Sequence, residues 1–152
     1  MSPRAKPATV RFYFDADLLG LAKVLVPLRS DITYPGDSGG VVHRRERPPC
    51  LIIDRATLDE IWIPRVAAQG WVIITRDSRI QDRAAERAAV KAYGAVKAYG
   101  ARMVALAGAD ARTVWAQLEV FMSQWRRIQA CTGQPGPFIY SATRTTFRAV
   151  PL

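Results

Sequence analysis

The stretch WVIITRD, residues 71–77, decides the fold class. Residues 71–75 are almost all apolar and rich in β-branched side chains, which is typical of a strand buried on both faces. Such strands occupy the centre of parallel sheets, because helices cover both faces of a parallel sheet. The sequence therefore predicts a central parallel strand that is followed directly by the carboxylate of Asp77.

Segments on both sides of this strand alternate between strand and helix patterns. Residues 10–14, VRFYF, predict a strand, and apolar residues at helical spacing follow from Asp17, the expected N-cap, to about Val26. The other expected elements are a strand at 32–34, helices at 57–68, at 78 to 93 or 99 and at 111–131, and strands at 102–106 and within 138–150. This alternation predicts an α/β fold in which helices sandwich a mostly parallel sheet.

Local signals suggest where two of these helices begin. Thr57 and Glu60 have the spacing of a capping box, although Pro64 either kinks this helix or starts it. Asp110 is the expected N-cap of the helix over 111–131.

Two segments fall outside the alternating pattern. Residues 36–56 contain glycines, prolines and several arginines, so we expect a long loop that begins with a turn at Pro35-Gly36-Asp37. We expect residues 1–9 to be a flexible N-terminus and residues 10–152 to form a single domain.

A short tandem repeat lies in the second half of the chain. Residues 89–94 and 95–100 both read AVKAYG. Six residues turn a helix by about 600°, so matching side chains lie about 240° apart and Val90 and Val96 cannot face the same core. We interpret the repeat as a duplication absorbed near the end of a helix, and a dedicated lysine–tyrosine surface is the alternative.

Composition limits the chemistry that this chain can perform. The formal net charge is +9, which indicates an anionic partner such as nucleic acid or an acidic protein surface, unless the excess is generic. His43 is the single histidine, and Cys50 and Cys131 are far apart, so a zinc site and a Ser-His-Asp mechanism are both disfavoured. Carboxylates must therefore carry any catalysis.

The sequence also bears on location. No apolar run approaches the roughly 20 residues that a bilayer helix needs, and residues 1–10 lack the apolar region of a signal peptide. We therefore expect a cytoplasmic protein with no membrane partner.

Acidic residues follow the predicted strands at informative positions. Asp15 and Asp77 each come after an apolar strand, and the carboxyl ends of parallel strands meet at one crevice. Asp59 and Glu60 begin the preceding helix and could approach the same crevice, and Asp17 and Asp82 are further candidates. Crowded carboxylates repel one another, and a divalent cation relieves that repulsion.

Oxygen ligands select Mg²⁺ or Mn²⁺, which can activate water for attack on a phosphodiester. The alternatives are structural: Asp17 as a helix cap, Asp59 and Glu60 as acids that interact with the helix dipole, and Asp82 as a surface partner of an arginine.

Several motifs together carry a family resemblance over roughly residues 10–147. FYFDAD at 12–17, TLDEIWIPRVAAQGWVIITRDSRI at 57–80, TYPGD at 33–37 and GPFIYSATR at 136–144 resemble the PIN-like domains, including the VapC-type toxins of bacterial toxin–antitoxin pairs. The resemblance implies a Rossmann-type α/β/α fold, a Mg²⁺-dependent endoribonuclease, an RNA substrate and a cognate antitoxin that covers the acidic cleft.

The resemblance also assigns roles to individual acids. It makes Asp15 the first acid, Asp77 the strand-end acid and Asp59 the helix-borne acid, with Glu60 as the alternative. The chain departs from the family where it has Asp15-Ala16-Asp17 in place of the frequent Asp-Glu-Asn. It also lacks an acid at 106–108, so a fourth ligand would have to come from Asp17 or Asp82.

Two other functions compete with the ribonuclease. A receiver-like signalling domain also gathers aspartates around Mg²⁺, but it needs a lysine after a later strand, and no lysine follows Lys97. A non-catalytic nucleic-acid- or partner-binding module of the same fold would use the arginines for binding. The helix over 111–131, with Trp115 and Trp125, could also form the interface of a homodimer.

Overall fold

The computed structural model describes residues 5–77, 83–107 and 111–152, without the side chains of residue 77 and residues 83–86. The strands are β1 (Lys6–Pro7), β2 (Phe12–Phe14), β3 (Ile32–Thr33), β4 (Gly40–Val42), β5 (Arg45–Arg47), β6 (Val72–Asp77), β7 (Arg102–Ala107), β8 (Phe138–Ala142) and β9 (Phe147–Ala149). The α-helices are α1 (Leu19–Leu25), α2 (Asp59–Ala68), α3 (Arg83–Tyr99), α4 (Val114–Ser123) and α5 (Trp125–Ala130), and short 3-10 helices span Ala16–Leu18 and Cys131–Gly133.

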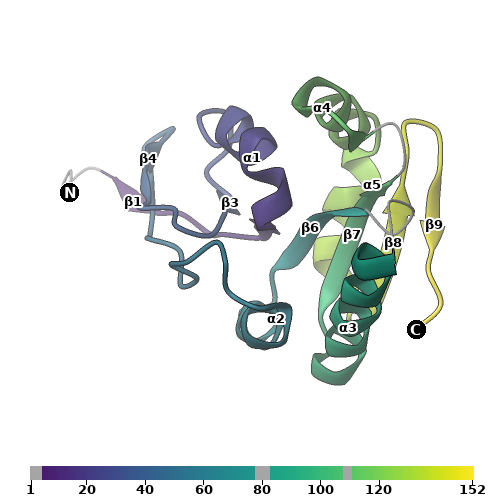
Figure 1. Cartoon of the computed structure of the whole chain (residues 1–152). Helices are drawn as coiled ribbons and strands as arrows, with labels where there is room; N and C mark the ends of the chain where they lie inside the picture. The colour runs from purple at the N-terminus through teal and green to yellow at the C-terminus, as the bar shows by residue number, and fades with distance from the viewer. Residues whose placement is uncertain (1–4, 78–82, 108–110) are drawn as a thin grey trace.

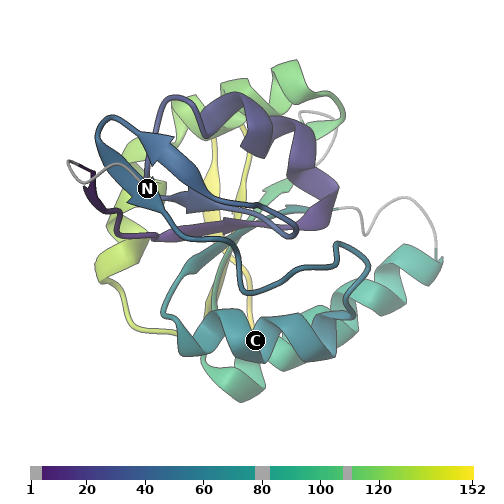
Figure 2. The same cartoon turned by 90° about the vertical axis from the view of Figure 1, so that its left-hand side faces the viewer.

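A six-stranded sheet forms the centre of the molecule, with the strand order β3-β2-β6-β7-β8-β9 (Figure 1). All neighbouring strands in it are parallel except β8 and β9, which pair antiparallel. Helices α1, α4 and α5 cover one face of this sheet, and α2 and α3 cover the other (Figures 1 and 2). The predicted α/β sandwich with a mostly parallel sheet is therefore confirmed.

Side chains on the central strands alternate between the two faces. Phe12 and Phe14 pack with α1, α4 and α5, whereas Tyr13 between them packs with α2 and α3. Residues 72–74 of β6 repeat the pattern, with Ile73 alone on the α2 and α3 side. Both faces are therefore buried, which explains why the central strands are apolar without a break.

The strand order changes direction between β2 and β6. The chain passes from β2 through α1 to β3 on one side, and then returns to place β6 on the other side of β2. The register aligns Phe12 with Val72 and Phe14 with Ile74. In open α/β sheets, such a switch point leaves a crevice at the carboxyl ends of the two strands.

The first helical segment begins earlier than the sequence suggests. The prediction that Asp17 is the N-cap is wrong, because Asp15 holds that position and its Oδ1 accepts a hydrogen bond from Ala16 N at 2.6 Å. The segment starts as a 3-10 turn and becomes α1 at Leu19.

The expected capping box at Thr57 does not form. Helix α2 begins at Asp59, and the hydroxyl of Thr57 donates to the carbonyl oxygen of Asp54 in the preceding turn. Pro64 lies inside α2 without ending it, and the helix ends before Gly70, whose φ of 73° is accessible to glycine at little cost.

The predicted helix over 111–131 is two helices that meet at Gln124. The described cap of α4 is Thr113, and the expected cap, Asp110, lies outside the described residues. The buried amide of Gln124 donates to the carbonyl oxygens of Thr143 and Thr146 in the β8–β9 turn, at 2.9 and 3.2 Å. The helical break therefore coincides with a tertiary contact that local sequence does not reveal.

The segment over 36–56 is more ordered than the expected loop. Strands β4 and β5 pair antiparallel, and β5 pairs parallel with β1, so a small three-stranded sheet lies beyond β3 (Figure 1). This pairing also engages residues 6–7 of the N-terminal segment that we expected to be flexible. A buried ion pair between Asp37 and Arg47 holds this sheet against the carbonyl oxygen of Ile32. The turn at 35–37 forms as predicted, with Gly36 at φ 81°.

Helix α3 continues through both AVKAYG copies. It passes Gly94 and ends at Tyr99, where Gly100 has a φ of 68°. Val96 is completely buried, whereas Val90 is 67% exposed, which confirms that the two valines face different surroundings. Within the described part of the chain, no helix has the length and apolar character to cross a bilayer.

The two valines provide a matched test of this packing. Val96→Ala should lower the free energy of unfolding by about 2 kcal/mol, because it leaves a cavity in the core. Val90→Ala should change it by less than about 0.5 kcal/mol, because the side chain is exposed. Urea denaturation of the two variants measures both values, and equal losses would contradict the burial of Val96 alone.

Candidate functional site

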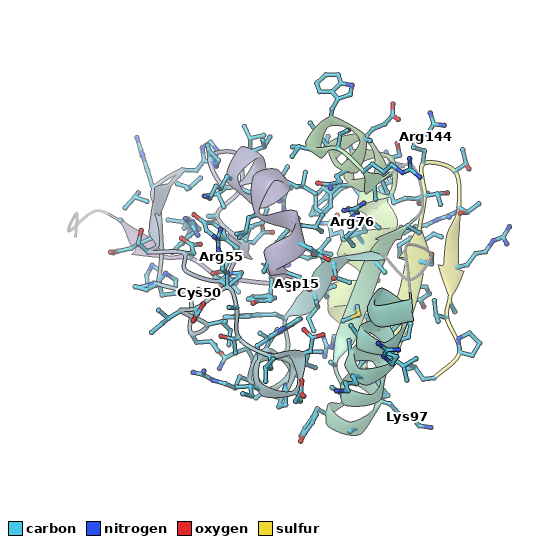
Figure 3. All side chains as sticks on the ribbon, in the orientation of Figure 1. Asp15, Cys50, Arg55, Arg76, Lys97 and Arg144 are labelled. Carbon is cyan, nitrogen blue, oxygen red and sulfur yellow. The ribbon has the colours of Figure 1, made fainter. Side chains whose placement is uncertain are left out.

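The first acid of the candidate site lies at the switch point between β2 and β6. The backbone N–H of Asp15 donates to the carbonyl oxygen of Ile74 at 2.9 Å, which extends the β2–β6 pairing by one residue. This places the carboxylate beside Thr75, whose hydroxyl is 3.0 Å from Asp15 Oδ2. Figure 3 shows Asp15 at the centre of the molecule, between α1 and β6.

The second acid is Asp17, which the 3-10 turn returns to the same strand end. Its Oδ2 lies 3.4 Å from the hydroxyl of Thr75 and 3.3 Å from the backbone nitrogen of Arg76. A hydroxyl has one proton to donate, so Thr75 can satisfy only one of the two carboxylates at a time. Asp15 and Asp17 therefore converge on one donor.

The third acid enters from α2. Asp59 is the first residue of that helix, and its Oδ1 accepts a hydrogen bond from the indole nitrogen of Trp62 at 2.9 Å. Glu60 is exposed and does not line the pocket that contains Asp15 and Asp17. Of the two alternatives for the helix-borne acid, only Asp59 therefore faces this pocket.

These acids line a pocket of about 180 Å³ at the carboxyl end of the sheet. Its walls come from the β2–α1 connection, α2, β6, β7 and α3, and small alanine side chains on α3 leave the space open. The lining residues are Asp15, Asp17, Asp59, Trp62, Thr75, Arg76, Ala88, Ala89, Ala92, Tyr93, Met103 and Ala105.

The surroundings of these carboxylates disfavour their charged form. Burial raises the pKa of Asp15 to about 6, and the nearby Asp59 adds to the rise. Burial also raises the pKa of Asp17, and the charge of Asp15 raises it further, although the positive charge of Arg76 opposes the shift. For Asp59 too, burial raises the pKa.

Tyr13 responds to the same field, and its ring lies 5.0 Å from that of Trp62, which lines the pocket. Burial raises the pKa of its phenol well above the usual range, and the charges of Asp15, Asp59 and Asp17 contribute. The three carboxylates therefore form one electrostatic cluster, although Asp59 lies far along the chain from Asp15 and Asp17.

The described residues do not form a complete metal site. Within residues 5–77, 83–107 and 111–152, no three histidine, cysteine, aspartate or glutamate side chains lie close enough to hold an ion. Asp77 is the last residue of β6 and pairs with Ala107, but its side chain lies outside the described part, as does all of Asp82. The oxygen donors present suit a hard divalent cation, and Asp15 with Asp17 supply two of them.

Sequence reasoning missed the residues that orient these acids. Thr75 and Trp62 donate to the carboxylates, and Tyr93 lines the pocket from α3. The signal for Thr75 was the Ile-Thr-x-Asp stretch at 74–77, where the threonine follows the buried strand. No local pattern in the sequence marks Trp62 or Tyr93.

A comparison with protein-family models identifies the architecture. The model described as PIN like domain matches residues 10–106. The chain belongs to the PIN-like domain family. A search of the curated proteins found no match, and a search of the solved structures found none either.

The match covers the candidate site of this PIN-like domain. Every residue that lines the acidic pocket, from Asp15 to Ala105, falls within the matched span. Helices α4 and α5 and strands β8 and β9 lie beyond it. Proteins with this domain are commonly nucleases, so the family supports a nuclease-type function that involves nucleic acid.

The raised pKa of Asp15 predicts how stability depends on pH without divalent metal. Between about pH 4 and pH 6, Asp15 holds a proton in the folded state that it has lost in the unfolded state. The contribution of Asp15 to the free energy of unfolding therefore falls as the pH rises through this range. Asp15→Asn removes this loss of about 2 kcal/mol. The difference between the Tm of this variant and that of the parent should therefore grow by about 5 °C in the variant's favour from pH 4.5 to pH 7.5. Melting curves in EDTA measure the difference, and a constant difference would contradict the raised pKa.

Proposed function

We propose that this PIN-like domain is a metal-dependent endoribonuclease, and specifically the toxin of a VapC-type toxin–antitoxin pair. The observation that carries the proposal is the convergence of Asp15, Asp17 and Asp59 on one pocket at the sheet's switch point. Structural helix caps would not need three carboxylates in one pocket with raised pKa values.

The electrostatics of the pocket favour a bound cation. Raised pKa values mean that the ionised carboxylates are costly in the apo protein, and a divalent ion offsets that cost. Asp15 and Asp17 would hold Mg²⁺ or Mn²⁺ together, and Asp59 and Asp77 are the proposed additional ligands. When bound, such an ion polarises a phosphate and lowers the pKa of a coordinated water.

The protein's own groups would position the reactants. The Thr75 hydroxyl orients the Asp15 and Asp17 carboxylates, and the Trp62 indole holds Asp59 in the wall of the pocket. With one histidine in the chain and none lining the pocket, proton transfer would pass through carboxylates and water. The net charge of +9 would attract the RNA polyanion.

The proposal includes partners that follow from the VapC-type assignment. A cognate antitoxin would insert a segment into the acidic pocket and block access of RNA in the cytoplasm. A homodimer could use α4, where Trp115 is 81% exposed, whereas Trp125 packs against Phe12 and Phe121 and is less available.

Cleavage of RNA by purified protein tests the nuclease assignment. With Mg²⁺ or Mn²⁺, the parent protein should cut structured RNA, and Asp15→Asn and Asp77→Asn should each lower the rate by about 100-fold or more. The matched control is Glu119→Gln, an exposed acid on α4, which should cut at the parental rate. Equal cleavage by all four proteins would assign the activity to a contaminant or to another site.

A metal titration separates Asp59 from Glu60 as the third ligand. Saturating Mn²⁺ should raise the Tm of the parent protein, because the ion binds only the folded state. Asp59→Asn should reduce that rise, and Glu60→Gln should preserve it, because Glu60 does not line the pocket. The opposite ranking would make Glu60 the third ligand in place of Asp59.

One observation favours a second function. Because the described residues alone do not complete a metal site, a non-catalytic module that binds nucleic acid or a protein partner is the competing proposal. Such a module would show no Mn²⁺-dependent rise in Tm, and its RNA binding would not depend on Asp15.

A further inference from the structure

The two identical AVKAYG copies have different environments in α3. In the first copy, Ala89, Ala92 and Tyr93 line the acidic pocket, and Lys91 lines a groove beside it. In the second copy, Ala95 and Val96 are buried in the core between α3, α2 and the sheet. Figure 3 shows Lys97, the counterpart of Lys91, at the outer end of α3 and well away from Asp15.

The groove beside the acidic pocket runs between α2 and α3. Its volume is about 420 Å³, and it adjoins the pocket, because Asp59 and Ala88 line both. The α2 wall and the preceding turn contribute Thr57, Leu58, Asp59 and Glu60, and the α3 wall contributes Arg87, Ala88 and Lys91.

The two walls of this groove differ in charge. Arg87 and Lys91 are exposed and lie one helical turn apart, about 6 Å along the axis of α3. Among the described residues, neither cation forms an ion pair, although Glu60 lies on the opposite wall. Leu58, which is 60% exposed, adds an apolar surface at the same place.

We propose that Arg87 and Lys91 bind backbone phosphates of the RNA next to the phosphate that is cleaved. This inference rests on the proposed ribonuclease function, because it assumes that the scissile phosphate enters the acidic pocket. An RNA strand that leaves this pocket past Asp59 and Ala88 meets the two cations in the adjoining groove. Its sugars and base faces can pack on Leu58.

The proposed cleavage of RNA in the adjoining pocket favours RNA over an acidic protein segment as the occupant of the groove. A phosphate in the acidic pocket can be neutralised by the cation held there, and the flanking phosphates then meet Arg87 and Lys91. An acidic peptide could place a carboxylate on the same cation, so its binding is the outcome that the test must separate from RNA binding.

Binding of a labelled single-stranded oligoribonucleotide tests the proposal. Full-length protein with Asp15→Asn serves as the background, because this change blocks the proposed cleavage and lowers the negative charge of the pocket. One contact between a cation and a phosphate of single-stranded RNA contributes about 0.7 to the salt slope. Lys91→Ala should therefore weaken binding about five-fold at 0.1 M salt and reduce that slope by about 0.7.

The duplication supplies the matched control. Lys97→Ala makes the same change in the same hexapeptide of the same helix and should leave affinity and slope unchanged. Arg87→Ala combined with Lys91→Ala should weaken binding about 25-fold and reduce the slope by about 1.4. Because these side chains are exposed, melting curves should show that all variants fold.

Three results would contradict the proposed phosphate-binding role of Arg87 and Lys91. They are equal effects of Lys91→Ala and Lys97→Ala on RNA affinity, an unchanged RNA affinity in the double variant, and failure of the Asp15→Asn background protein to bind RNA. Loss of oligoglutamate binding with unchanged RNA binding would instead assign the groove to an acidic protein and would also overturn it.

Cleavage assays with Asp15 intact distinguish this failure from failure of the nuclease function. If the parent and Lys91→Ala cut RNA with the same KM, the result supports the nuclease function and contradicts the phosphate-binding role of Lys91. If none of these proteins cuts RNA but Lys91→Ala weakens RNA binding and Lys97→Ala does not, the result supports the phosphate-binding groove and contradicts the nuclease function.

Discussion

The backbone pairing of β2 with β6 is the constraint on which the candidate site depends. It aligns Phe14 with Ile74 and continues one residue further, where Asp15 N–H donates to the Ile74 carbonyl oxygen. That bond holds Asp15 beside Thr75 at the point where the strand order reverses. Ligands of open α/β sheets bind in the crevice at such a switch point, and here the acids line a pocket there.

The same pairing concentrates negative charge where the fold provides little compensation. Thr75 offers one hydroxyl proton to two carboxylates, and Trp62 satisfies one oxygen of Asp59. The pKa values of Asp15 and Asp17 are raised in consequence, first by burial and then by neighbouring carboxylates. An apo protein that retains such a cluster gives up stability at neutral pH, a cost that the proposed binding of a cation would offset.

The sequence predicted the fold class and placed Asp15 and Asp77 at the carboxyl ends of two strands, which are the adjacent β2 and β6. The reason is that buried parallel strands leave a strong apolar pattern with polar residues at their ends. The sequence left the choice between Asp59 and Glu60 open, since one helical residue differs from the next by about 100° and only the packing of α2 decides which one faces the sheet. The strands within 36–56 escaped prediction because a partner far along the chain, in β1, and the buried Asp37–Arg47 pair stabilise them.

The AVKAYG repeat separates what sequence and tertiary structure each determine. The sequence by itself determined that the two copies must face different directions, because six residues do not complete a whole number of helical turns. Only the tertiary structure decided that Val96 enters the core while Lys91 lines the groove beside the acidic pocket. The physical reason is that helical periodicity sets relative angles within α3, whereas packing against the sheet and α2 sets which angle points inward.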